Sequence, residues 1–181
     1  MNYYGGKELA AAFRTVRKNT IQIAEDIPED KYTFKPSPES RTVAQLLVHI
    51  AVSTTFPTVI HGGKISDMSK VDFQEMFGTI TAEEAKPRDK AAIVALLKTT
   101  GDQFAALLET FTDPFLGEVL EMRAGGDPPA RTRFDMLLSA KEHEMHHRGQ
   151  LMVMQRLVGV VPHLTRLMQE RMARMQAQAT T

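Results

Sequence analysis

Apolar side chains recur at steps of three and four residues in four long stretches of this chain. This spacing limits the fold more than any other feature, because it places the apolar residues on one face of an α-helix. The stretches cover residues 7–27, 42–57, 89–111 and 132–158. Four amphipathic helices bury their apolar faces by packing against one another, so we predict an all-α helical bundle.

Capping residues and a proline mark the ends of the predicted helices. Thr42 and Gln45 have the spacing of a capping box, in which two side chains satisfy free backbone N–H groups at a helix start. Asp89 and Thr132 are residue types preferred at the start of the third and fourth helices. Pro57 cannot donate a backbone hydrogen bond, so it should kink or end the second helix.

The segments between these helices have the composition of loops. The proline-rich segment after the first helix carries Tyr32 and Phe34, which should pack it against the core. Residues 64–88 predict a loop with a short helical turn. Residues 112–131 predict a long connection, with a brief strand in the sequence LGEVLEM.

The length of 181 residues fits one domain spanning residues 1–181. The bundle core should cover about 7–158, and a further apolar stripe predicts an extra C-terminal helix at about 162–175. Hydrophobic residues make up 43% of the chain and charged residues 24%, as in ordinary globular proteins.

The charge balance argues against two classes of partner. The 22 basic and 22 acidic residues cancel, which leaves no net attraction to nucleic acid or to anionic lipid. No apolar run approaches the ~20 residues of a membrane span. The first ten residues, MNYYGGKELA, lack the basic start and apolar core of a signal peptide. We therefore expect a cytoplasmic protein with no nucleic-acid or membrane partner.

The chain contains no cysteine. Thiolate metal sites and cysteine nucleophiles are therefore excluded, and a metal ion would need histidine, aspartate or glutamate ligands.

The sequence HEMHHRGQL, residues 143–151, places three histidines within five positions of the fourth helix. Successive helical residues are about 100° apart, so His143 and His147 point within about 40° of each other. Ala140, one turn earlier on that face, leaves space for a ligand. A pair of His143 with His146 is the alternative, and a solvated surface turn would also account for the cluster.

His49 lies at the edge of the buried stripe of the second helix, beside Leu46 and Ile50. A buried imidazole needs a partner, which can be a backbone carbonyl or a metal ion. Together with the pair on the fourth helix, His49 would complete a three-ligand site for a divalent ion with open positions.

The remaining polar candidates have simpler interpretations. We expect Glu144 to be solvated or to form a salt bridge between helices, and His146 to point outward or to contact a ligand side chain. His61 and His163 are expected at the surface. Gln150 could orient a water or substrate, or it could serve helix packing.

Two motifs resemble the DinB/YfiT-like superfamily of four-helix metal-dependent proteins. They are RTVAQLLVHIA, which contains His49, and HEMHHRGQL, which contains His143 and His147. The loop sequence IPEDKYTFKPSPE is also similar, so the resemblance covers about residues 7–158. It implies an up-down-down-up four-helix bundle whose metal ligands are these three histidines.

The resemblance also implies an activity. Characterised relatives act as thiol-dependent transferases or isomerases, so we expect a divalent metal, zinc or nickel, and a small thiol that reacts with an electrophilic small molecule. A metal-dependent hydrolase is one alternative, and a non-enzymatic, stress-related metal-binding protein is another. No catalytic residue beyond the metal ligands is assigned.

The last predicted helix carries an apolar stripe that could serve assembly. Its members are Leu164, Leu167, Met168, Met172 and Met175. Since zero net charge offers little repulsion between copies, this stripe favours a homodimer.

Overall fold

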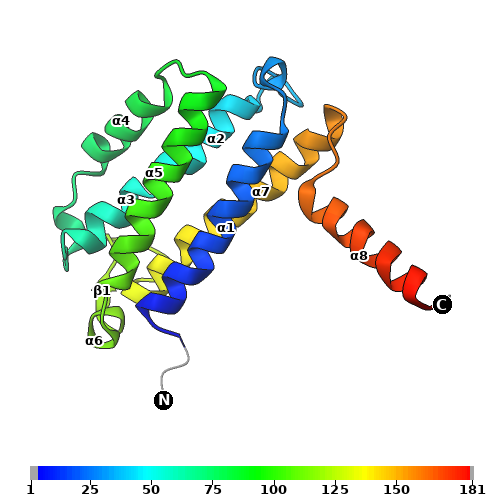
Figure 1. The fold of residues 1–181 in the computed structure, drawn as a ribbon. Coiled ribbons are helices and arrows are strands. Elements are labelled where there is room, and N and C mark those ends of the chain that lie inside the picture. Colours follow the sequence, from blue (N-terminus) through cyan, green and yellow to red (C-terminus); the bar gives the residue numbers. More distant parts are fainter. Residues whose placement is uncertain (1–3, 180–181) are drawn as a thin grey trace.

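The four long helices form as predicted, and they pack into a bundle in the computed structural model, which describes residues 4–179 (Figure 1). The helices are α1 (Gly6–Asp26), α2 (Val43–Val52), α5 (Lys90–Glu109) and α7 (Arg133–Leu157). They run up, down, down and up, and α1 and α2 each pack against both α5 and α7. The predicted fold class is confirmed.

The helix starts are capped by the residues that the sequence indicated. Thr42 Oγ1 accepts a hydrogen bond from the Gln45 backbone N–H (3.1 Å), and Gln45 Oε1 accepts from the Thr42 N–H (2.9 Å). The Asp89 and Thr132 side chains likewise accept from the backbone N–H three residues later. These bonds satisfy donors that a helix start leaves free.

Pro57 breaks the second helix, as predicted. After α2 the chain continues as α3 (Thr55–Pro57) and then as a π-helical turn, η2 (Thr58–Gly62). The missing donor of the proline is accommodated by this change in helical geometry.

Short elements connect the long helices. They are the 3₁₀ turns η1 (Glu29–Lys31) and η3 (Met68–Lys70), the short helix α6 (Asp113–Leu116), and the strands β1 (Val119–Glu121) and β2 (Ala130–Thr132). The two strands pair antiparallel, with Leu120 opposite Arg131. The strand predicted in LGEVLEM is therefore present.

The prediction of a loop over residues 64–88 is wrong, because α4 (Phe73–Glu84) occupies half of it. The Asp72 side chain caps this helix by accepting the Glu75 backbone N–H (2.9 Å). Met76 is the one buried residue of this helix, and Gly78 lowers helix propensity, so the apolar pattern is weak. Contacts with α2 stabilise the helix in place of a strong sequence pattern.

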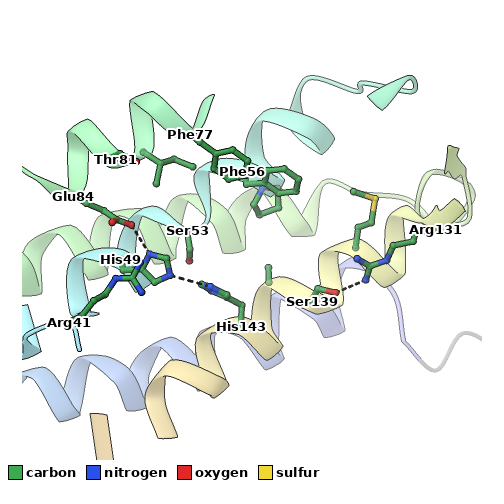
Figure 2. A pocket seen from close by; sticks show the side chains of 14 residues that line it. Arg41, His49, Ser53, Phe56, Phe77, Thr81, Glu84, Arg131, Ser139 and His143 are labelled. Atoms are coloured by element: carbon green, nitrogen blue, oxygen red, sulfur yellow. Dashed lines mark hydrogen bonds and ion pairs between the residues drawn. The ribbon is translucent and has the colours of Figure 1, made fainter. Parts of the chain in front are cut away.

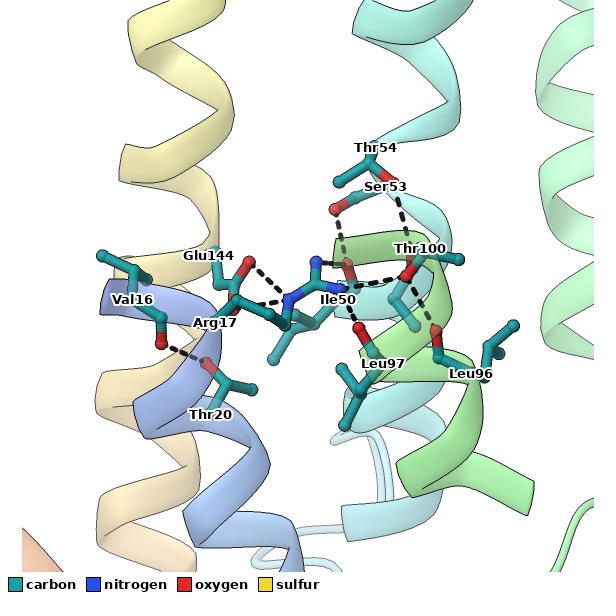
Figure 3. Close-up of polar contacts among 11 residues, drawn as sticks. Val16, Arg17, Thr20, Ile50, Ser53, Thr54, Leu96, Leu97, Thr100 and Glu144 are labelled. Carbon is teal, nitrogen blue, oxygen red and sulfur yellow. Dashed lines mark hydrogen bonds and ion pairs between the residues drawn. The ribbon is translucent and has the colours of Figure 1, made fainter. Parts of the chain in front are cut away.

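A buried ion pair and its hydrogen bonds join the four long helices (Figure 3). Nε of Arg17, on α1, donates to both carboxylate oxygens of Glu144, on α7, at 3.0 Å. The same guanidinium donates to Leu97 O (2.7 Å) and Thr100 Oγ1 (2.9 Å) on α5, and to Ile50 O (3.3 Å) on α2. The expected inter-helix salt bridge of Glu144 is present, although this residue is only 1% exposed and so is not solvated.

Gly101 makes room for this arginine. A Cβ atom at position 101 would lie 2.6 Å from Arg17 Cγ, which is closer than non-bonded atoms approach. The glycine within α5 therefore costs helix propensity but permits the ion pair.

Two histidines predicted at the surface are buried. His61 is fully buried in η2, where the Arg133 guanidinium donates to its Nδ1 (3.4 Å). Burial, and then the charge of Arg133, lowers the pKa of His61 to about 4. His163 begins α8 (His163–Ala179), and its Nε2 is 3.1 Å from Asn19 Oδ1 on α1. Both errors arose because these residues lie outside the main helical pattern.

The extra C-terminal helix α8 projects away from the bundle (Figure 1). Its predicted apolar stripe is exposed, with Leu164 at 37%, Leu167 at 54%, Met168 at 57%, Met172 at 45% and Met175 at 55%. The homodimer stays a prediction that this exposure favours.

The prediction that no apolar stretch is long enough to span a membrane is wrong when helices are judged by length and composition alone. Two helical stretches, Val43–Gly62 and Lys90–Glu109, are long and apolar enough. Both supply core residues of the bundle, as core helices of soluble proteins do. The expected lack of a membrane partner stays a prediction.

Removing one member of the buried ion pair should destabilise the bundle strongly. Glu144→Ala leaves the Arg17 charge buried without a partner, so the free energy of unfolding should fall by about 3–5 kcal/mol in urea denaturation. The double variant Arg17→Met/Glu144→Leu should recover most of this loss. Equal losses in the two variants would show that the uncompensated charge is not the cause.

Introducing charge into the α8 stripe should dissociate the predicted dimer. Met168→Glu with Met172→Glu should give a monomer in light scattering, because like charges would face each other across the interface. Val119→Glu, at an exposed apolar residue (64%) on β1, is the control. A wild-type monomer, or an unchanged dimer in the α8 variant, would remove this helix from the interface.

Candidate metal centre

Three imidazole rings from two helices meet at one point. Nε2 of His143 is 3.3 Å from Nε2 of His49 and 3.1 Å from Nε2 of His147. The candidate ligand atoms all lie within 4.8 Å of one another. The structure thus brings together the three residues selected from the sequence, and their role as metal ligands stays a prediction.

Hydrogen bonds on the far sides of two rings fix their orientation. Nδ1 of His49 lies 2.6 Å from Glu84 Oε1, and Nδ1 of His147 lies 2.9 Å from Gln150 Oε1. A carboxylate and an amide oxygen only accept hydrogen bonds, so both Nδ1 atoms carry hydrogen. In the neutral form of each ring, the Nε2 lone pair of His49 and of His147 therefore points into the cluster.

This donor set suits a cation. When His49 and His147 are neutral, only the Nε2 atom of His143 can carry a hydrogen, so the cluster then holds more lone pairs than donors. A tetrahedral ion with bonds of about 2.0–2.1 Å separates its ligand nitrogens by about 3.3–3.4 Å. The two distances from His143 Nε2, 3.1 and 3.3 Å, are close to this spacing, and the third pair of nitrogens lies within 4.8 Å. Within residues 4–179 the group contains no fourth ligand, so an ion held by these three nitrogens would keep a coordination position open.

The protein environment keeps two of these imidazoles neutral. Burial, and then the charges of His147 and His49, lowers the pKa of His143 to about 4. Burial also lowers the pKa of His147, against the opposing effect of its hydrogen bond to Gln150. Arg41 contributes to lowering the pKa of both rings. Neutral imidazole is the form that binds metal ions.

Of the two residues that orient the ligand rings, sequence analysis identifies only Gln150 as a candidate. Glu84 was missed, because it lies at the end of the helix that was predicted as a loop. Gln150 was a candidate for orienting water or substrate, and the structure shows it bonded to His147. Its Nε2 also donates to Nε2 of His146 (3.2 Å), and the His146 ring itself contacts the His147 ring, with centroids 4.9 Å apart. A hydrogen-bonded carboxylate or amide behind a ligating histidine raises its basicity and holds its ring in place.

A cavity of about 450 Å³, which we call the α4 chamber, lies beside His49 and His143 (Figure 2). Its other walls come from α2, α3, α4, β2 and the first half of α7. Ala140 lines it, as expected for a small residue next to a ligand site.

A second cavity of about 410 Å³, which we call the α7 groove, lies beside His147. It is lined by the loop residues Pro36, Glu39, Ser40 and Arg41, by Leu46, and by Gln150, Val153 and Met154 of α7. Arg41 lines both cavities.

Comparison with known families agrees with this geometry. Residues 12–151 match the model of the DinB superfamily, and this match includes all three histidines of the cluster. The chain belongs to the DinB superfamily. The resemblance noted from the two motifs is confirmed.

Similar proteins share the DinB fold over most of their length. The uncharacterized protein YjoA of Bacillus subtilis (strain 168) is 27% identical over 153 residues, which are 84% of this chain and 90% of YjoA. The crystal structure of YjoA, a DinB-like protein, superposes with a TM-score of 0.63, covering 84% of this chain and 92% of YjoA.

Two more distant solved structures show the same fold. YfiT from Bacillus subtilis, described as a probable metal-dependent hydrolase with an unusual four-helix bundle topology, is 16% identical with a TM-score of 0.65. The match covers 88% of this chain and 91% of YfiT. The mycothiol-dependent maleylpyruvate isomerase is 10% identical with a TM-score of 0.62, covering 82% of this chain and 61% of the isomerase.

The cluster geometry predicts which histidines hold a metal ion in this DinB protein. His49→Ala, His143→Ala and His147→Ala should each abolish stoichiometric zinc or nickel in elemental analysis, because each removes an inward Nε2. His146→Ala is the matched control and should retain most of the metal. Equal loss in all four variants would contradict the assignment.

Proposed function

We propose that this protein is a metal-dependent transferase that joins a small thiol to an electrophilic small molecule. The observation that supports it is the group of three inward-facing imidazole nitrogens, open on one side and bordered by two cavities. His49, His143 and His147 would hold the ion, and zinc or nickel suits three imidazoles equally well.

A divalent ion held there supplies Lewis acidity, which favours the anionic form of a thiol or water at neutral pH. The protein provides the remaining requirements. Glu84 and Gln150 fix the directions of two ligand rings. Arg41, at the edge of both cavities, places a positive charge where an anionic nucleophile would approach.

The chain itself offers no activated nucleophile at this place. It has no cysteine, so a thiol must come from solution. The two serines of the α4 chamber donate to backbone carbonyls, Ser53 to Ile50 O (2.9 Å) and Ser139 to Asp135 O (3.1 Å). Neither hydroxyl has a histidine as hydrogen-bond partner in the part of the chain that the structure describes, so neither is activated.

A hydrolase is the second candidate, because the same open position could accept water instead of a thiol. The related structures support both candidates: one is named for its dependence on mycothiol, and another is described as a probable metal-dependent hydrolase. The polar cavity beside His147, in addition to the chamber, favours the reaction with two organic substrates.

We also propose a cytoplasmic homodimer without nucleic-acid or membrane partners.

The transferase should require both metal and thiol. Protein loaded with zinc or with nickel should join L-cysteine or glutathione to chlorodinitrobenzene, followed by absorbance. Chelated protein and His143→Ala should fall to the background rate. Efficient hydrolysis of esters or amides without thiol, and no thiol transfer, would favour the hydrolase. Neither activity across a broad panel would favour a non-enzymatic metal-binding protein with a role in stress.

A further inference from the structure

Successive stretches of one helix, α7, line the two cavities beside the histidine cluster. The first half of α7, from Met136 to His143, lines the α4 chamber. The second half, from His147 to Met154, lines the α7 groove. His143 and His147 are one helical turn apart, about 6 Å. Molecules in the two cavities would therefore contact different histidines of the same cluster.

The α4 chamber has the lining of a site for an apolar, aromatic molecule. Phe56 and Phe77 lie nearly parallel in its wall, with ring centroids 6.3 Å apart and planes at 10°. Ile80, Met136 and Ala140 add further apolar surface. A volume of about 450 Å³ falls in the range of small-molecule sites.

The α7 groove has a more polar lining and opens beside an exposed loop. Glu39, Ser40 and Arg41 of this loop face Gln150 and His147 across it. Such a lining suits a small hydrophilic molecule better than an apolar one.

The two arginines at these cavities differ in their partners. Arg131, at the chamber, donates to Asp135 (2.5 Å) and to Ser139 Oγ (2.6 Å), so its charge is already compensated. Arg41 forms neither a hydrogen bond nor an ion pair with any residue in the described range 4–179. A guanidinium without a partner at a cavity is suited to bind a carboxylate.

We propose that the two cavities hold both co-substrates at once. An aromatic electrophile would occupy the α4 chamber, and a small thiol bearing a carboxylate would occupy the α7 groove with that carboxylate on Arg41. This inference rests on the proposed thiol transfer. In the reaction the thiol sulfur forms a bond to the electrophilic carbon, the bond from carbon to its leaving group breaks, the leaving group departs with the electron pair, and the thiol proton goes to solvent.

Inhibition patterns test whether the two sites are separate. The zinc-loaded protein is assayed with benzyl bromide and mercaptoacetate, and the unreactive mimic (methylthio)acetate is added. The mimic should compete with mercaptoacetate but not with benzyl bromide. Competition with both substrates would show one shared site and overturn the inference.

Variants test the two assignments separately. Ala140→Leu should raise KM for benzyl bromide and leave KM for mercaptoacetate within about twofold, because it fills only the chamber. Arg41→Gln should raise KM for mercaptoacetate about tenfold and leave KM for the neutral thiol mercaptoethanol unchanged. Arg131→Gln is the matched arginine control and should not change KM for mercaptoacetate. Equal effects of the two arginine variants would contradict the role of Arg41.

A binding measurement separates this inference from the proposed function. Calorimetry on zinc-loaded protein should give the same Kd for (methylthio)acetate with and without saturating benzyl alcohol, which mimics the electrophile. Joint binding without any thiol-dependent turnover would refute the transferase but keep the two sites. Turnover with mutually exclusive binding, or no binding of either probe, would overturn the two-site arrangement.

Discussion

The buried pair of Arg17 and Glu144 sets the geometry on which the rest of this protein depends. The Arg17 guanidinium, on α1, donates hydrogen bonds to residues of α2, α5 and α7. One side chain therefore fixes four helices relative to one another. Glu144 follows His143 directly, and successive helical residues point about 100° apart. When Glu144 faces α1, the helix is rotated so that His143 and His147 face α2. The ion pair thus couples the packing of the core to the orientation of the histidine cluster.

Around this frame, the candidate metal centre combines fixed ligands with accessible space. Glu84 and Gln150 hold two rings from behind, so their nitrogens stay directed inward. α4 contributes both Glu84 and a wall of the apolar chamber. One helix therefore supports a ligand and shapes the space beside it. Among the described residues the cluster offers three protein nitrogens, whereas a structural metal site is closed by four protein ligands.

Much of this arrangement was predictable from the sequence, because it depends on local periodicity. The long helices, their caps and the shared face of His143 and His147 follow from residue spacing alone. The features that sequence analysis did not predict depend on contacts between segments that are distant in the chain. α4 is held by packing on α2, so its weak pattern looked like a loop and Glu84 was missed. Arg17 and Glu144 are 127 positions apart, and no local signal connects them. His61 and His163 became buried through turns that the periodicity does not cover.

X-ray absorption spectroscopy of the metal-loaded protein in solution is the most direct test of the central claim. We predict three imidazole nitrogens at about 2.0–2.2 Å from the ion and at least one ligand from solvent. Addition of mercaptoacetate should replace a light ligand by sulfur at about 2.3 Å. A shell of four protein ligands that does not change with thiol, or fewer than three imidazoles, would contradict the open three-histidine centre.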